Sequence, residues 1–482
     1  MWHRLSPYAK LCIDVAHPDR LLPAEPGTRQ IARRLYQSTR ALPIVSPHGH
    51  CDPSVLAEDR SFGDPAIELV TRDHYLLRML YSQGVPLQSL GVQPRDGSPA
   101  ETDGRQIWRT FARNFHLFRG TPSRLWLEHT LSEVFGLGVP LRPETADRTY
   151  DEMCTRLEEE RFRPRALFDR FGIEFLATTD SALSDLGPHA ILRASGWPGR
   201  VVPTFRPDDV VDPSRPGFRS NLEKLGDLTR CDTSSWKGYL DAIRQRRAEF
   251  ACAGATASDH GHPSALTADL ATPEAEALFA RVTGDADSAD DAERFRALML
   301  VQMAAMSMDD GLVLQLHAGA WRDHNPSLFA RFGPDIGADV PRPSGYVGAL
   351  KPLLDRFGNE DRLTVVVYTL DETTYSRELA PLAGHYPALR LGPPWWFFDS
   401  PEGMRRFYRM VTETAGFANT VGFNDDARSL LTIPGRHDVA RRVNAGYLAE
   451  LVAEHRMAED DAETIAADLA YHLAARTFRT TL

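Results

Sequence analysis

The chain has 482 residues and a formal net charge of −11, with 42% hydrophobic and 25% charged residues. This composition is ordinary for a globular protein. The acidic balance argues against nucleic acid as the main partner, because phosphate binding needs a basic surface. It leaves a small anionic substrate open, since a local pocket can be positive on an acidic protein. No stretch approaches the roughly 18 apolar residues that a membrane span needs, so no membrane partner is expected.

The spacing of the cysteines and the composition of the first 20 residues together indicate the cellular compartment of the protein. The five cysteines are far apart, odd in number and form no CxxC pair, which argues against a disulfide framework and against a thiolate zinc site. The opening MWHRLSPYAKLCIDVAHPDR lacks an apolar core of signal-peptide length. We therefore predict a cytoplasmic protein.

Seven segments share one pattern, an apolar run that ends abruptly in polar residues. Runs of this kind are typical of parallel strands that are covered on both faces. The segments are 41–50, 171–180, 201–209, 312–322, 363–371, 389–399 and 420–429.

Helical stretches separate these runs, for example 344–358 and 400–416. The alternation predicts an α/β fold, and we interpret it as a (β/α)8 TIM barrel whose missing strand lies near 255–261. An open, doubly wound sheet is the alternative.

We predict a single barrel domain over 1–482. Residues 51–165 and 207–311 are long and largely helical, and we interpret them as insertions because no linker marks a separate domain. Within the first insertion, 103–136 predicts two amphipathic helices broken at Gly120-Thr121-Pro122.

The sharpest local motif is His48-Gly49-His50, at the end of the first run. Residues i and i+2 of a strand point to the same side, and barrel active sites lie at the carboxyl ends of the strands. Two imidazoles there suit a divalent metal ion. Read alone, the motif is also compatible with surface histidines in a loop.

Two other strand ends strengthen the metal hypothesis. His317 ends the run LVLQLH, and Asp425 and Asp426 follow TVGFN. Singly, these would be a core histidine and a polar turn. Together with the HGH motif they supply three imidazoles and a carboxylate, a shell that suits one catalytic divalent ion, most simply zinc, with manganese as the alternative.

Three arginines follow strand ends and suit an anionic ligand. They are Arg206, Arg322 and Arg428. Guanidinium groups pair with carboxylates in a bidentate fork, which fits a sugar acid. The alternative for any one of them is an ion pair in a loop.

Several of these segments match one family in the same order, from about residue 40 to the C-terminus. The chain resembles the uronate isomerases, metal-dependent barrels of the amidohydrolase superfamily. The matching segments are HGH (48–50), RDHYLLR (72–78), ATTDSALSDLGPH (177–189), PTFRPD (203–208), SDHG (258–261), LHAGAWRDHN (316–325), PWWFFDSPEGM (394–404) and DARSLLTIPGRHDVARR (426–442).

The resemblance implies roles for individual residues. It implies a metal shell made of His48, His50, His317 and Asp426, where Asp426 is preferred to Asp425 because Asp-x-Arg-Ser then aligns. It implies that Tyr75 is the active-site tyrosine. It places four residues at the substrate: His74, Arg206, Arg322 and Arg428. Leu76 and Ala427 stand where the family has lysine and serine, so a different sugar acid stays open as substrate.

The expected reaction is aldose–ketose isomerisation of a hexuronate, from D-glucuronate to D-fructuronate or from D-galacturonate to D-tagaturonate. Asp426 and Tyr75 are the expected proton-transfer pair. One alternative is a mononuclear hydrolase of the same superfamily acting on a sugar-acid lactone. A two-metal hydrolase is disfavoured, because 363–371 ends without histidine and SDHG offers no bridging lysine. The other alternative is a non-catalytic protein that binds a sugar acid. A homo-oligomer is the default expectation.

Overall fold

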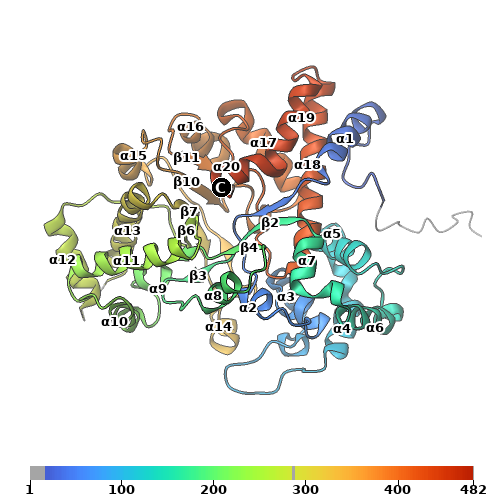
Figure 1. Cartoon of the computed structure of the whole chain (residues 1–482), viewed down its shortest axis with the longest axis horizontal. Coiled ribbons are helices and arrows are strands. Elements are labelled where there is room, and N and C mark those ends of the chain that lie inside the picture. The colour runs from blue at the N-terminus through green and yellow to red at the C-terminus, as the bar shows by residue number, and fades with distance from the viewer. Residues whose placement is uncertain (1–16, 285–287, 481–482) are drawn as a thin grey trace, which may run out of the picture.

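The computed structural model describes residues 17–284 and 288–480. Short parallel strands form its centre and helices surround them (Figure 1). The strands are β1 (Ile44–Ser46), β2 (Ile173–Ala177), β3 (Asp180–Ser181), β4 (Arg200–Val202), β5 (Phe205–Arg206), β6 (Ala257–His260), β7 (Val313–Ala318), β8 (Ala320–Trp321), β9 (Val340–Pro341), β10 (Val365–Thr369) and β11 (Leu389–Leu391).

The strands pair in chain order, as in a barrel. β1 pairs with β2 and β2 with β4, while β3 pairs with β5 and the series continues through β6, β7, β10 and β11, all parallel. Since β2–β3 and β4–β5 each form one interrupted strand, seven positions are filled. A parallel bridge from Leu391 to Thr420 supplies the eighth. Sequential neighbours throughout exclude the doubly wound sheet, whose strand order reverses.

The strand sequences explain their burial. All six residues of β7 and all five of β10 are buried, and β10 reads VVVYT. β-Branched and aromatic side chains favour strands that are packed on both faces. The weak run before residue 257 still yields β6, which confirms the strand predicted near 255–261.

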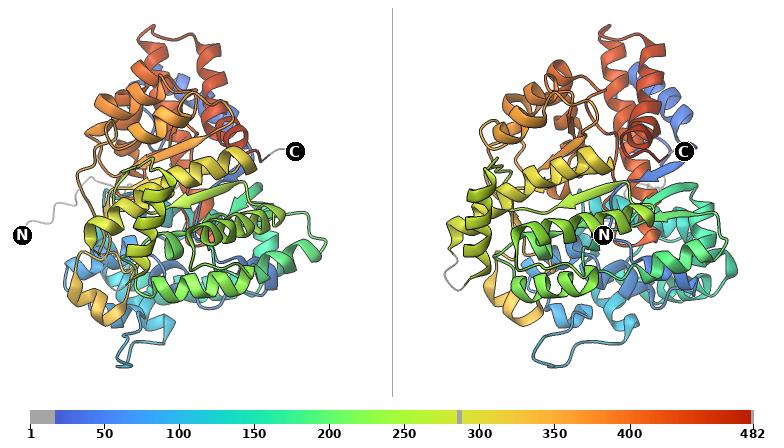
Figure 2. Two further views of the ribbon diagram at one scale, coloured as in Figure 1. Left: turned by 90° about the vertical axis from the view of Figure 1, so that its left-hand side faces the viewer. Right: turned by 60° about the vertical axis from the view of Figure 1, so that its left-hand side comes forward.

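The helices gather in groups around the barrel (Figures 1 and 2). Between β1 and β2 lie α2 (Pro53–Glu58), α3 (His74–Ser82), α4 (Gly104–Asn114), α5 (Pro122–His129), α6 (Ala146–Leu157) and α7 (Pro164–Arg170). After β3 and β5 come α8 (Gly187–Ala194), α9 (Asp208–Val211), α10 (Phe218–Thr229) and α11 (Trp236–Cys252). After β6 and β7 come α12 (Thr272–Thr283), α13 (Ala289–Asp310), α14 (Pro326–Phe332) and α15 (Lys351–Phe357). The rest are α16 (Ala380–Ala383), α17 (Pro401–Ala415), α18 (Ile433–Ala453), α19 (Glu459–Ala467), α20 (Leu473–Thr477) and, before β1, α1 (Pro26–Thr39).

The first long segment between strands has a core of its own. α4 and α5 are the two helices predicted within 103–136, and the hydroxyl of Thr121 caps α5. Trp108 is fully buried there and its indole N–H donates to Thr149 at 3.0 Å. The second segment, 207–311, contains α9–α13 with β6 between α11 and α12. The division into one domain with two insertions stays a prediction.

The described residues also bear on the cysteine and membrane predictions. Four cysteines lie in this part of the chain and all are free thiols: Cys51, Cys154, Cys231 and Cys252. Across residues 17–284 and 288–480, no helix combines the length and apolarity that crossing a bilayer would take. The opening segment behind the compartment prediction lies largely in 1–16, outside the described residues.

A core substitution in β7 tests the buried barrel. Leu314 is fully buried between β6 and β10, so Leu314→Ala should lower the free energy of unfolding by about 2–5 kcal/mol through lost burial and a residual cavity. Urea denaturation measures the change. Leu228→Ala is the matched control: this leucine on α10 is 46% exposed and should change stability by less than about 0.5 kcal/mol. Equal effects of the two substitutions would contradict the packing described.

Candidate metal centre and its cavity

His48 and His50 follow β1 and point toward the last barrel segment. Their ring centroids are 5.3 Å apart. The N–H of His50 donates to the carbonyl of Ala427 at 2.8 Å. A Cβ at Gly49 would lie 3.3 Å from that same carbonyl oxygen, so glycine permits this close approach of the two segments.

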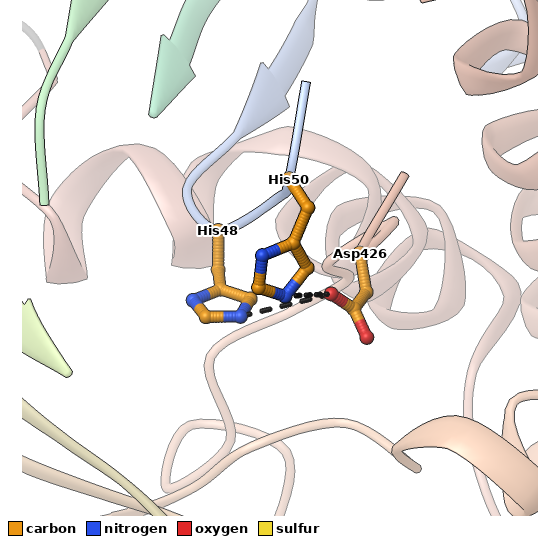
Figure 3. Close-up of side chains that lie close together, drawn as sticks. All are labelled: His48, His50 and Asp426. Atoms are coloured by element: carbon orange, nitrogen blue, oxygen red, sulfur yellow. Dashed lines mark ion pairs between the residues drawn. The ribbon is translucent and has the colours of Figure 1, made fainter. Parts of the chain in front are cut away.

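Asp426 is the carboxylate that meets the two histidines. Its Oδ1 lies 3.3 Å from Nε2 of His50 and 3.7 Å from Nε2 of His48 (Figure 3). The backbone at Asp426 is left-handed, with φ of 46°, and its N–H donates to Oδ1 of Asn424 at 3.0 Å. Asp425 is instead fully buried against Nε2 of His437, at 3.1 Å. The geometry therefore favours Asp426 over Asp425 as the residue that faces the site.

The protonation states of this group suit a cation. Burial lowers the pKa of His48 to about 3, so its imidazole is neutral at pH 7. Burial alone would raise the pKa of Asp426, but the neighbouring imidazoles, His50 first, lower it further than burial raises it. Oδ1 of Asp426 is buried and has no hydrogen-bond partner among the described residues. The neutral imidazole of His48, the adjacent imidazole of His50 and the ionised carboxylate of Asp426 with its unsatisfied oxygen fit a divalent metal ion.

His317 lies beside this group at the end of β7. Its ring is 4.4 Å from the ring of His48 and stacks on Tyr368 at 4.0 Å. Its Nδ1 lies 2.6 Å from Oδ1 of Asp259, and its Nε2 is buried without a hydrogen-bond partner in the described structure. His317 thus shares a potential ligand group with His48 and Asp259, whereas His50 and Asp426 share the other group with His48.

A cavity of about 810 Å³ opens at these strand ends, and all four predicted metal ligands line it. His74, Arg206, Arg322 and Arg428 line it too, as the sequence analysis expects of substrate-binding residues. Much of the outer wall comes from the segment between β7 and α15, of which only Arg322 was predicted to take part. Its contributions are Ala320, Trp321, Arg322, Asp323, Phe329, Pro334, Asp335, Asp339 and Arg342.

The three predicted arginines differ in how strongly they are already paired. Arg206 donates to Asp208 and to Asp259, both at 2.8 Å. Arg322 is 2.9 Å from Asp339 and its guanidinium lies over the ring of Trp396 at 5.3 Å.

Arg428 has the weakest pairing of the three. It reaches Asp335 at 3.4 Å, and the Asp335 side chain is 57% exposed. Arg428 is therefore the arginine most free to bind an incoming anion or hydroxyl group.

Tyr75 stands behind the cavity wall, not in it. It is buried on α3, stacks on His74 at 4.5 Å and lies near the guanidinium of Arg436, 5.5 Å from its ring centroid. With Asp426 and Arg428 it lines a small adjoining hollow. Its hydroxyl has no hydrogen-bond partner within the described residues. Burial holds the pKa of Tyr75 well above its ordinary value against the opposing charge of Arg436, so the phenol is protonated at pH 7.

Sequence reasoning missed Asp259 and Arg436. Asp259 sits in SDHG, where an acid lies next to the last residue of a short strand, β6, that follows a weak apolar run, and that was the available signal. Arg436 lies on α18, ten residues beyond Asp426, where no local pattern points to the site. It donates to Asp399 at 3.1 Å and to the carbonyl of Asp425 at 3.0 Å, so it supports the turn that presents Asp426.

Comparison with known proteins shows the family to which the chain belongs. A family model described as glucuronate isomerase matches residues 27–478. The uronate isomerase of Rhizorhabdus wittichii is 60% identical over 463 residues, which are 96% of this chain and 98% of that protein.

Solved structures give the same result. The crystal structure of glucuronate isomerase from Caulobacter crescentus has a TM-score of 0.95 and 54% identity, and the match covers 97% of each chain. That of uronate isomerase from Thermotoga maritima has a TM-score of 0.89 and 28% identity, covering 96% of this chain and 99% of the other. The amidohydrolase-type barrel is thereby confirmed, and the hydrolase alternative is not favoured. This chain belongs to the glucuronate isomerase family, whose members are isomerases of sugar acids.

Proposed function

We propose that this chain interconverts a hexuronate and its ketose, D-glucuronate with D-fructuronate or D-galacturonate with D-tagaturonate. One observation carries the proposal: an ionised carboxylate, Asp426, and a protonated phenol, Tyr75, border one small hollow at the edge of an arginine-lined cavity. Aldose–ketose exchange needs a base that takes a proton from carbon and an acid that gives a proton to the carbonyl oxygen.

The reaction is a proton shift. A base removes the proton from the carbon next to the aldehyde, and the electron pair of that C–H bond forms the C=C bond of an enediol while the carbonyl oxygen gains a proton. The second hydroxyl then loses its proton, its oxygen becomes the ketone, and the former aldehyde carbon gains a proton. Asp426 is suited to accept protons because it is ionised, and Tyr75 to donate them because it is not.

We assign the metal site to His48, His50 and Asp426, with His317 beside them as the fourth member. A divalent ion held there would supply a Lewis acid that polarises and orients substrate oxygens. Zinc is our first choice, and manganese fits the same nitrogen and oxygen donors. The proposal is supported by the separations of 3.3 and 3.7 Å between Asp426 and the two imidazoles.

We assign substrate binding to His74, Arg322 and Arg428. Arg428 is the leading residue because its ion pair with Asp335 is long, at 3.4 Å, and the Asp335 side chain is 57% exposed to water. Arg322 is held between Asp339 and Trp396 and shapes the outer wall of the cavity. Arg206, tied to two buried carboxylates, is the least available of the predicted arginines.

Incubation with sugar acids tests the proposed activity directly. Purified protein supplied with zinc or manganese should form a ketose from glucuronate, from galacturonate or from both, and NMR or a ketose-specific colour reaction measures the product. D-Glucose is the control, because it has the aldehyde but no carboxylate. Hydrolysis of a hexuronate lactone with no ketose from either acid would contradict the proposal and favour the hydrolase alternative.

His50→Ala tests the metal site. The variant should lose metal content, because one of the four proposed ligands goes, and its turnover should fall on the order of 10²-fold or more. Elemental analysis and the ketose assay measure the two effects. His116→Ala, which removes an exposed histidine elsewhere, is the control and should keep both. Full metal content and activity in the His50 variant would remove this residue from the centre.

Tyr75→Phe tests the proton donor. The variant should keep its metal and its fold, because the Tyr75 hydroxyl has no hydrogen-bond partner within the described residues. Its turnover should fall by about 10²–10⁴-fold, because the proposed proton donor is lost. Tyr81→Phe is a matched control on the same helix, since Tyr81 is 41% exposed and lies at the far end of α3. Steady-state kinetics compare the variants, and an unchanged rate for Tyr75→Phe would exclude this hydroxyl from the reaction.

A further inference from the structure

A second buried carboxylate lies on the other side of His48 from Asp426. Nε2 of His48 is 3.7 Å from Asp426, and Nδ1 of the same ring is 4.0 Å from Oδ2 of Asp259. Asp259 belongs to β6 and is fully buried, whereas the Asp426 side chain is 15% exposed. The two acids therefore occupy different environments, one at the cavity and one beneath it.

Both oxygens of Asp259 already have donors. Oδ1 is 2.6 Å from Nδ1 of His317, and Oδ2 accepts from Arg206 at 2.8 Å. A carboxylate that is paired with a guanidinium accepts hydrogen bonds and has no proton to donate. The proton in the short contact therefore belongs to Nδ1 of His317.

His48, Asp259 and His317 could in principle hold a metal ion themselves, because their ligand atoms lie within 4.8 Å of one another. Such an ion would have to displace Arg206 from Asp259. The guanidinium is also anchored by Asp208, at 2.8 Å, and Asp208 in turn accepts from the N–H of Gly261 and from Arg215. The charge of Asp259 is thus compensated by protein groups, and the hydrogen-bonded arrangement is the better account of this trio.

We propose that Asp259 is a positioning residue that fixes the proton of His317 on Nδ1 and so keeps Nε2 as a free lone pair. Nε2 is buried and has no partner among the described residues, and His317 lines the cavity. A carboxylate on one imidazole nitrogen orients the ring and makes the other nitrogen a better acceptor or ligand. Arg206 acts as the counter-ion of Asp259, not as a clamp on the substrate.

Histidine NMR tests the tautomer without any assay of turnover. In long-range ¹H–¹⁵N spectra of protein labelled with ¹⁵N at histidine, His317 should show the Nδ1–H form, with a His317→Asn variant identifying its signals. In Asp259→Ala the same signals should shift toward a mixture of tautomers, because the acceptor is gone. Asp208→Asn is the matched control: it removes the other carboxylate from Arg206 without touching His317 and should leave the tautomer unchanged.

Two outcomes would overturn the proposal. One is an Nε2–H form of His317 in the unsubstituted protein, a result that needs no variant to fold. The other is an unaltered His317 spectrum in a folded Asp259→Ala protein. Absence of isomerase activity would contradict the proposed function and leave this result standing.

Zinc affinity tests what the fixed tautomer does, and this step rests on the proposed metal site. In competition with a chelator, Asp259→Ala should bind zinc about 10–100-fold more weakly than the unsubstituted protein, with the same stoichiometry. An unchanged affinity would show that Nε2 does not serve the metal. Complete loss of binding would show that Asp259 is itself a ligand and would overturn the positioning role.

Discussion

The site depends on one contact between the first and last segments of the barrel, the hydrogen bond from the His50 N–H to the carbonyl of Ala427. Residues 48–50 and 424–428 are almost 380 residues apart in the chain, and this bond sets their distance. Gly49 allows it, because a side chain there would press on the same carbonyl. The left-handed turn at Asp426 then aims its carboxylate at the two imidazoles. The same contact therefore joins the two ends of the barrel and brings the ligand group together, where the strand ends meet.

Two networks of ion pairs compensate the buried charges beneath the cavity. Removing one charged side chain from water costs several kcal/mol of free energy, so buried charges are stable only where oppositely charged partners and hydrogen bonds replace the water. Asp259, Arg206 and Asp208 form one such chain, and Asp399 with Arg436 forms another under Tyr75. Burial raises the pKa of Asp399 to about 7 even though Arg436 opposes the shift. Arg428, the most weakly paired of the three predicted arginines, gives a chain with a net charge of −11 a cationic group at the cavity that can receive an anion.

The sequence was most informative where a strand end coincided with a reactive side chain. His48, His50, His317 and Asp426 end apolar runs, and strand geometry brings such ends to one rim, so their common cavity could be predicted. The structure divides the ligands into two groups that share His48, one with His50 and Asp426 and the other with Asp259 and His317. This division could not be predicted, because it depends on which nitrogen of each ring faces which carboxylate. Arg206 shows the same limit. Its strand-end position suggests a substrate role, but its partner Asp259 is 53 residues away and on a different strand. The spacing of residues within one strand does not show which residue of a different strand will contact them.

The helical segment after β1 provides what the strand ends lack. The rim supplies imidazoles and carboxylates, which at pH 7 are ligands and bases, and a proton shift also needs a donor. In the proposed reaction α3 delivers one, Tyr75. Asp73 accepts from the backbone N–H groups of Tyr75 and Leu76 and so fixes where the helix begins. That cap holds His74 toward the main cavity and Tyr75 toward the hollow beside Asp426. A tyrosine on a flexible loop could find water for its hydroxyl, whereas Tyr75, buried at a capped helix start, is protonated and has no hydrogen-bond partner for its hydroxyl among the described residues. The segment between β1 and β2 would thus take part in the proposed catalysis, since the strand ends alone would present the proposed base without its acid.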